Sequence, residues 1–341
     1  MYPHPMESLS KFPFRALARN FCPSFPLWAR AVVFFVVPFL YCLNTAHAES
    51  QITFLYPVYH SDADRIINEI RDGAHEYSGN NINEIAFDTT EQNSSAQKKV
   101  EALSEGDTVV TLTTALGDFI RSSGFKGRLI EGASDNPSIT GSTVSVGIDP
   151  SPVTYIESLI RINPEIEKIF YFTFKSNGKT EAQEEAAKLH EIANDKQVDL
   201  KFISVDNLDG AMHRINEVIS GNDPATTAMW IPNRILSMSN NTVLKYVLRE
   251  AWGRSFIVFT DSLDAVARGL LFSLIPDYQA YGKYLGRLAE KATGQDDPPV
   301  SESIRYFDDV YLMLNQRFSV HIGLNINRSI IEKYKIVVPA K

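Results

Sequence analysis

The chain has 341 residues, of which 33 are Lys or Arg and 41 are Asp or Glu, so its formal net charge is −8. An acidic protein is repelled by phosphate backbones, which argues against nucleic-acid binding. The length allows a leader segment followed by one large domain or two domains of ordinary size.

The first 48 residues predict an export signal. Basic residues occur from Lys11 to Arg30, an apolar run extends from Ala31 to Leu43, and Ala46-His47-Ala48 places small residues where a signal peptidase cuts. The run is shorter than the roughly 20 residues that span a bilayer as a helix. We expect cleavage after Ala48 and a periplasmic mature protein. Two alternatives are an uncleaved membrane anchor and a true start at Met6.

Both cysteines, Cys22 and Cys42, lie in this leader. The remaining chain therefore has no disulfide, no thiolate metal site and no cysteine nucleophile. Cys42 could carry a lipid, but the large Tyr41 before it disfavours that reaction. The leader holds four basic residues and one acidic residue, so the rest carries 29 basic and 40 acidic residues and a net charge of −11. No later segment is apolar and long enough to span a membrane.

After residue 49 the chain alternates between short β-rich runs and helical patterns. Asp62 to Tyr77 has Ile66, Ile67, Ile70, Ala74 and Tyr77 on one side, at helical spacing. Thr113 or Thr114 is expected to cap the helix that ends near Ile120. In this half the strands are predicted at 52–56, 82–87, 107–112 and 127–131, and the other helix at 94–104.

The alternation starts again after Pro150, following a break near 142–150. Helices are predicted at 152–163, 178–194, 211–220, 237–251 and 277–293, and strands at 168–172, 200–205, 226–231 and 255–259. Repeated strand–helix–strand units predict parallel sheets with helices on both faces. The fold class is therefore α/β, with two doubly wound lobes at 49–146 and 147–274, and a segment at 275–341 that crosses the hinge and is shared by both. The alternative is one continuous sheet of ten or more strands.

The carboxyl ends of parallel strands meet at one edge of a sheet, beside the partly positive N-termini of helices. Two lobes with facing edges can close on a small polar solute. This geometry predicts a binding protein.

No catalytic or metal-binding constellation is present in the sequence. His60, His75, His190, His213 and His321 occur at no metal-ligand spacing with a carboxylate. The glycine-rich stretch at 141–147 lacks the lysine of a phosphate loop, and no nucleophile elbow occurs. Paired acids such as Asp308-Asp309 are expected on solvated surface. We therefore expect no enzyme, no cofactor and no metal.

The second half contains motifs whose order is informative. Phe174-Lys175-Ser176-Asn177 follows a strand, Trp230-Ile231-Pro232-Asn233 ends another, and Phe259-Thr260-Asp261-Ser262 ends a third. Pro276-Asp277-Tyr278 and Tyr311 to Asn315 come later. This order resembles the periplasmic substrate-binding proteins of ABC importers, in the subfamily often associated with aromatic or branched amino acids. The resemblance covers roughly residues 51–324.

The resemblance implies the type I periplasmic binding fold, with two lobes, three crossovers and a hinge, and a solute held between the lobes. It implies first-lobe contacts in the loop 56–61, at the 113–115 turn and after the fourth strand, and second-lobe contacts at four positions matching the motifs. An aspartate there could bind an ammonium group, and an aromatic ring could stack on a side chain. The implied ligand-binding residues are Tyr56, Thr113, Thr114, Ser134, Asp135, Phe174, Asn177, Asn233, Asp261 and Tyr278.

The sequence departs from the family pattern at two points. The segment between the fourth strand and the glycine-rich crossover is short, and Asn233-Arg234 stands where an acidic residue often follows the proline. Arg234 could place a positive charge near the solute and favour an anion.

We expect a protein that binds a small polar solute, such as an amino acid, and delivers it to an ABC permease. The first alternative is a sensor of the same fold that signals to a membrane kinase or cyclase. The second is an enzyme on a related fold, which turnover of a bound solute by the purified protein would reveal.

Overall fold

The computed structural model describes residues 51–61, 63–79, 81–88, 94–134, 139–140, 142–174, 189–293, 306–324 and 336–337. The predicted leader, the site residues Asp135 and Asn177, and most of the predicted helix at 178–194 lie outside these residues. In the part of the chain that is described, no helix has the length and hydropathy needed to cross a membrane.

The first sheet has the order β2-β1-β3-β4-β6-β5. Its first five strands are parallel, and the two-residue β5 pairs antiparallel with β6 at the edge. The strands are β1 (Ile52–Val58), β2 (Ile82–Asp88), β3 (Thr108–Thr111), β4 (Arg128–Glu131), β5 (Ile139–Thr140) and β6 (Thr143–Ser145).

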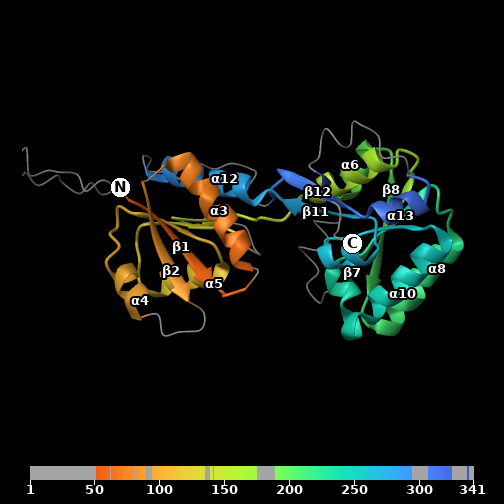
Figure 1. Cartoon of the computed structure of the whole chain (residues 1–341), viewed down its shortest axis with the longest axis horizontal. Coiled ribbons are helices and arrows are strands. Elements are labelled where there is room, and N and C mark those ends of the chain that lie inside the picture. The colour runs from red at the N-terminus through yellow and green to blue at the C-terminus, as the bar shows by residue number, and fades with distance from the viewer. Residues whose placement is uncertain are drawn as a thin grey trace, which may run out of the picture. The chain divides into compact units, whose positions relative to one another are not determined.

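Helices cover both faces of this sheet. Side chains alternate along β1, so successive apolar residues point to opposite faces and both faces need to be covered. Phe54 points to the face covered by α3 (Ala63–Ser78) and α12 (Tyr278–Thr293), and packs with Ile70 and Leu285. Leu55 points to the other face, which α4 (Ser94–Glu101) and α5 (Thr114–Ser122) cover. Figure 1 shows the two helix layers on either side of β1 and β2.

Helices α3 and α12 touch backbone to backbone, at two glycines. A Cβ atom on Gly73 would overlap the carbonyl oxygen of Gln279, and a Cβ on Gly282 would overlap that of Ile70. Only glycine allows this approach. A helix that follows the second sheet in the chain therefore completes the core of the first lobe.

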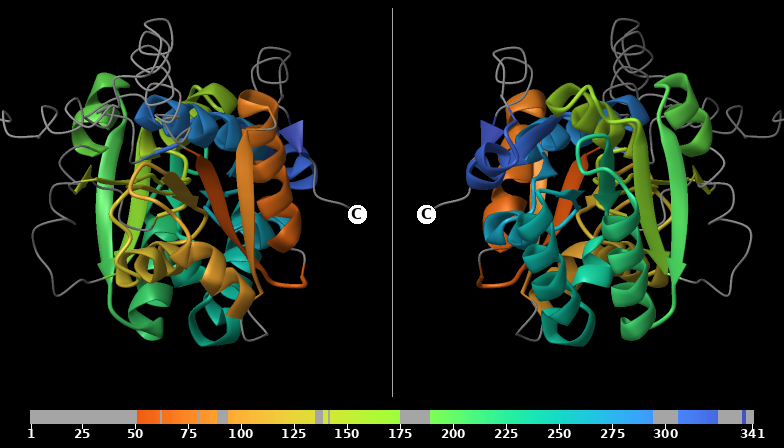
Figure 2. Two further views of the ribbon diagram at one scale, coloured as in Figure 1. Left: turned by 90° about the vertical axis from the view of Figure 1, so that its left-hand side faces the viewer. Right: turned by 90° about the vertical axis from the view of Figure 1, so that its right-hand side faces the viewer.

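The second sheet has the order β10-β9-β7-β8, and all its strands are parallel. Figure 2 shows the long strands β7 and β8 side by side, in yellow-green and green. The strands are β7 (Lys168–Phe174), β8 (Asp199–Val205), β9 (Thr227–Trp230) and β10 (Ile257–Phe259), and the helices of this lobe include α6 (Pro152–Ile162), α8 (Leu208–Gly221) and α10 (Met238–Arg254).

The core of the second lobe contains a chain of aromatic rings. The centroids of Tyr155 and Trp230 are 5.0 Å apart, those of Trp230 and Phe259 5.4 Å, and those of Phe259 and Phe272 4.9 Å. The last pair is stacked with an interplanar angle of 3°. Burial raises the pKa of the Tyr155 hydroxyl above its ordinary value.

Three chain segments are hydrogen-bonded to one another where the chain passes between the sheets. Strand β11 (Phe272–Pro276) pairs antiparallel with β12 (Val310–Leu314), which also pairs with β13 (Ile336–Val337). The N–H of Asp277 donates to the carbonyl of Asp309 at 2.8 Å, and the N–H of Phe307 donates to that of Asp149 at 3.0 Å. The short helices α11 (Leu263–Arg268) and α13 (Gln316–His321) flank β11 and β12 in the chain.

Asp308 joins two of these segments. Its carboxylate accepts from the N–H of Ser151 at 2.9 Å and from the hydroxyl of Thr154 at 2.7 Å. Ser151 is the N-cap of α6, so the acid also lies at the positive end of that helix. Asp308 is exposed, as the sequence predicts, but its contacts with Ser151 and Thr154 could not be predicted, because a contact over 150 residues of chain leaves no trace in local sequence.

The α/β class with two doubly wound parallel sheets is confirmed, and one continuous sheet is excluded for the described residues. One local prediction was wrong: Tyr77 is 40% exposed, because it lies beside Gly286 of α12 rather than beneath the sheet. The helix predicted at 237–251 is confirmed as α10. The short helix α9 (Asn233–Leu236) precedes it, and α10 contains positive φ angles at Ser239, Asn240 and Asn241. Asparagine tolerates that conformation.

Candidate functional site

The carboxyl ends of four adjacent strands bring polar residues together at one edge of the first sheet. His60 follows β1, Asp88 ends β2, Thr113 and Thr114 follow β3, and Ser134 follows β4. Asp88 was not selected as a site residue from the sequence, and His60 was included only as part of the loop 56–61. The strand order, which local sequence does not encode, makes them neighbours.

The loop after β1 is held in a left-handed turn. His60 has φ of 52°, and the carboxylate of Asp64 accepts from the N–H groups of Tyr59 at 2.8 Å and of Ser61 at 3.1 Å. The hydrogen bond from Tyr59 lowers the pKa of Asp64 below its ordinary value. The turn aims the His60 ring at Asp88, with Nε2 2.7 Å from Oδ2.

The helix α5 begins at this edge as the sequence predicts. Thr113 is the N-cap, and its Oγ1 accepts from the N–H of Leu116 at 3.3 Å. The Oγ1 of Thr114 is buried and has no hydrogen-bond partner in the described part of the chain. Ser134 is buried, and its N–H donates to the carbonyl of Val146 at 2.9 Å.

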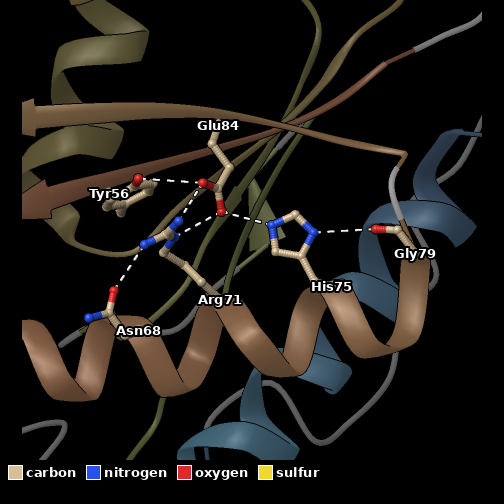
Figure 3. A network of polar contacts seen from close by, with 6 residues as sticks. All are labelled: Tyr56, Asn68, Arg71, His75, Gly79 and Glu84. Carbon is tan, nitrogen blue, oxygen red and sulfur yellow. Dashed lines mark hydrogen bonds and ion pairs between the residues drawn. The ribbon is translucent and has the colours of Figure 1, made fainter.

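Tyr56 does not lie in a loop, because β1 continues to Val58. Its side chain is 8% exposed and takes part in the polar network of Figure 3, beneath α3. Its hydroxyl donates to Glu84 at 3.5 Å, and the guanidinium of Arg71 lies 4.3 Å from its ring centroid. Burial raises the pKa of Tyr56 above its ordinary value. The loop predicted at 56–61 therefore begins only after Val58.

Glu84 is the centre of this network. It accepts from Arg71 Nε at 2.8 Å and Nη2 at 2.5 Å, and its Oε1 lies 2.9 Å from Nε2 of His75 (Figure 3). Burial opposes ionisation of Glu84, but the hydrogen bonds from Arg71 and His75 outweigh it and lower the pKa of the carboxyl group. The network stabilises the lobe between β2 and α3.

At the carboxyl edge of the second sheet, three of the predicted residues lie in one row. Tyr171 of β7 and Phe259 of β10 both pair with Trp230 of β9. Phe174, Asn233 and Asp261 follow these paired residues by two or three positions, so they lie at the same edge of adjacent strands. The N–H of Asn233 donates to Oδ1 of Asp261 at 2.5 Å, so two of the three are in direct contact.

Arg234 belongs to this row as well. It is exposed, and its guanidinium carbon lies 5.9 Å from the centroid of the Phe174 ring. No described residue forms an ion pair or hydrogen bond with its side chain. The row therefore combines an aromatic ring, a cation and a carboxylate that is engaged with backbone.

Tyr278 is at a different place from the one predicted. It is the first residue of α12 and packs against the first-lobe core cluster that contains Phe54 and Leu285. Burial raises its pKa above the ordinary value. Nearby, the hydroxyl of Tyr281 accepts from the N–H of Ala133 at 2.8 Å and donates to the carbonyl of Val146 at 3.2 Å.

A cavity of about 400 Å³ lies at the opposite, amino edge of the second sheet, lined by residues such as Asn163, Ala225, Ser255 and Gly323. Its position before β9 and β10 separates it from the row that contains Phe174. In the described ranges, no three side chains of His, Cys, Asp or Glu are placed to hold a metal ion.

No protein-family model matches this sequence, and no curated protein matches it. Solved structures match its fold. A ligand-free, open substrate-binding protein with adhesive properties from Clostridium difficile has a TM-score of 0.64 at 13% identity, over 85% of this chain and all of the other. An ABC domain in complex with L-Trp from Streptococcus pneumoniae scores 0.49 at 16% identity, over 85% of this chain and all of the other.

A periplasmic ribose ABC transporter protein from Conexibacter woesei scores 0.46 at 13% identity, over 82% of this chain and 96% of the other. The assignment of the fold rests on the first of these three structures and on the two parallel sheets. The chain has the α/β fold of that substrate-binding protein, with two parallel sheets, which is the type I periplasmic binding protein fold.

Proposed function

We propose that this protein is an exported solute-binding protein that captures a small polar molecule between its lobes and delivers it to an ABC importer. The observation that carries the proposal is the joining of two parallel sheets by three hydrogen-bonded segments, at 146–151, 272–277 and 307–314. Such a linkage lets two lobes change their relative orientation while each keeps its own core.

The chemistry of the two sheet edges supports the same function. One edge offers the start of α5 with Thr113 and Thr114, and the other offers Phe174, Asn233 and Asp261. A solute that contacts both edges binds the closed form better than the open form, and only such differential binding drives closure. Export to the periplasm and docking on a permease belong to this proposal.

The experiment is a thermal-shift screen of the purified protein against amino acids, small carboxylates, purines and sugars. A true ligand present at about 100 times its dissociation constant adds roughly 2.7 kcal/mol to the free energy of unfolding. If no member of any class raises the melting temperature, the proposal is wrong. Turnover of a bound solute would replace it with an enzymatic function.

Two threonines on the same strand region give a matched test of the first-lobe edge. Thr114→Val removes the unpartnered hydroxyl at the carboxyl end of β3, and Thr108→Val removes an unpartnered hydroxyl at the amino end. We expect Thr114→Val to weaken solute binding at least tenfold and Thr108→Val to leave it unchanged. Equal effects of the two changes would remove this edge from the site.

A further inference from the structure

We propose that Arg234 and Phe174 form an anion-binding subsite that selects an organic carboxylate with a flat, unsaturated or aromatic body. The inference rests on the proposed solute-binding function and names the chemical class of the solute. Its physical basis is a cation that has no counterion among the described residues and lies near an aromatic ring at the carboxyl edge of a parallel sheet.

The state of the neighbouring acids supports an anionic ligand. Asp261 accepts hydrogen bonds from the N–H of Asn233 at 2.5 Å and from the hydroxyl of Thr260 at 3.3 Å. Its carboxylate is therefore already hydrogen-bonded at the start of α9. At the edge of the first sheet, Asp64 binds loop N–H groups and Asp88 binds His60. Two charged side chains at the edge of the second sheet, Arg234 and Asp206, have no hydrogen-bond or ion-pair partner among the described residues, and Arg234 is the one that lies near the Phe174 ring.

Four other arginines of the second lobe differ from Arg234, whereas Arg317 of α13 is also exposed and without an ion pair among the described residues. Arg214, Arg249, Arg254 and Arg268 each lie within 4 Å of a carboxylate, on Glu217, Glu250 or Asp264. Arg234 is the exposed arginine that lies in the row with Phe174, and it has no such pair among the described residues. An ordinary surface role therefore accounts for those four better than for Arg234.

The geometry fits a planar carboxylate. When a guanidinium stacks on a ring, the planar face of the guanidinium contacts the ring. Its N–H donors point outward from the edge of the guanidinium plane, where a carboxylate can bind in bidentate fashion. The distance of 5.9 Å to the Phe174 centroid is at the outer limit of a cation–π contact, so the ring does not compete strongly for the cation. The half-buried ring offers apolar surface on which a flat ligand can stack.

Asp206 defines the alternative that the test must exclude. It follows β8, whose Val205 pairs with Phe174 of β7. Asp206 and Arg234 therefore follow the two strands that lie on either side of β7. A ligand with both an ammonium and a carboxylate group could use the two charges together. The comparison of a carboxylate with its amino-acid counterpart separates the two cases.

The test is calorimetric titration of the purified protein with benzoate, benzamide, 3-phenylpropanoate and phenylalanine, each with the wild type, Arg234→Gln and Arg249→Gln. Arg249 is the matched control, because its guanidinium also lies over a ring, 5.1 Å from the centroid of Tyr246. We expect at least one carboxylate to bind, benzamide not to bind, and Arg234→Gln to weaken carboxylate binding tenfold to a hundredfold. Arg249→Gln should leave the dissociation constant unchanged.

Three results would overturn the inference. They are equal binding of benzoate and benzamide, phenylalanine binding more than tenfold tighter than 3-phenylpropanoate, and full carboxylate affinity in Arg234→Gln. In each of these cases solute binding itself persists, so the proposed function stands. Binding of sugars or purines alone would also overturn the inference and keep the function, whereas binding of no solute class at all would overturn both.

Discussion

In the first lobe, ionised side chains are packed beneath helices on both faces of the sheet, whereas the core of the second lobe is a series of aromatic rings. Glu84 binds Arg71 and His75 beneath α3, and the buried Glu131 binds Arg121 of α5 and accepts from the hydroxyl of Ser145 at 2.6 Å. In the second lobe, stacked rings extend from Tyr155 to Phe272.

The difference shows that one strand–helix topology tolerates two sources of stability. Partly buried ion pairs depend on the ionisation of the acids, whereas aromatic burial does not depend on pH. We therefore expect the two lobes to respond differently to the same change in conditions. Trp230 and Trp252 both lie in the second lobe and Trp28 lies in the leader, so tryptophan fluorescence of the leader-free chain reports on the second lobe alone.

The largest effect is expected from Phe259→Ala. The change removes a fully buried ring that contacts Trp230 and Phe272, and a cavity of this kind costs about 3–5 kcal/mol of unfolding free energy. Urea unfolding followed by tryptophan fluorescence measures it. The control is Val320→Ala, at a side chain that is 70% exposed, which should change stability by less than about 0.5 kcal/mol. A loss below 1 kcal/mol for Phe259→Ala would contradict the aromatic core.

Gly282→Ala should be next in size. Its methyl group must push α12 away from the Ile70 carbonyl, which costs about 2–4 kcal/mol. We expect far-UV circular dichroism to show a larger shift of the urea midpoint than tryptophan fluorescence, because the damage lies in the first lobe. Gly253→Ala in α10 is the matched control, since its methyl group would meet nothing within 4 Å and should be neutral or stabilising. Equal midpoint shifts by the two probes would show that the lobes unfold as one unit.

Glu84→Gln should cost about 1–3 kcal/mol near pH 7, because it leaves the half-buried Arg71 without its anion. The pKa of Glu84 is lowered in the folded protein, so its stabilisation is complete above the unfolded pKa of about 4.3 and is lost as pH falls through the folded value. The difference in urea midpoint between variant and wild type should therefore shrink below about pH 4.

Glu217→Gln provides the control for that measurement. Glu217 binds Arg214 and His213 on the exposed surface of α8, and the hydrogen bond from Arg214 lowers its pKa as well. An exposed pair of this kind contributes little to the free energy of unfolding, because solvent screens the charges. If the two variants lose the same stability at pH 7, the contrast between the lobes in their use of charge is not supported.

The smallest effect is expected from Asp308→Asn, which acts on the connection between the lobes. The amide oxygen can still accept from Ser151 and Thr154, so the variant loses only the attraction of the charge to the start of α6, about 0.3–1 kcal/mol. The thermal midpoint should fall slightly, and that of Asp309→Asn should not, because Asp309 uses its backbone carbonyl here. A larger fall for Asp309→Asn would reverse the roles of the two acids.

The order of strands and helices could be predicted from the sequence, because the apolar periods of β1, α3 and α8 are local. The cap at Thr113 and the proline at the start of α6 are local signals too. The antiparallel pair β11–β12 could not be predicted, because its partners lie more than 30 residues apart and share no period.

Phe174, Asn233 and Asp261 were predicted as site residues from the resemblance rather than from any local pattern. They lie in one row because β7, β9 and β10 are neighbours in the second sheet. The contact of Arg234 with Phe174 could not be predicted, because it depends on the turn into the short helix α9. The assignment of Tyr278 to the second lobe failed for a similar reason. Nothing in the sequence near α12 states which lobe the helix packs on.

The packing of α12 on the first lobe has a consequence for how the chain matures. The N-terminal part of a chain leaves the ribosome first during synthesis, so β1 to β6 emerge long before residues 278–293. Until then the face that carries Phe54 and Ile130 is covered by α3 but not by α12, although the second lobe in between can already collapse. The lobe that is synthesised first is thus the last to be finished, and during that delay the part of its apolar face that α12 will cover is a target for a chaperone.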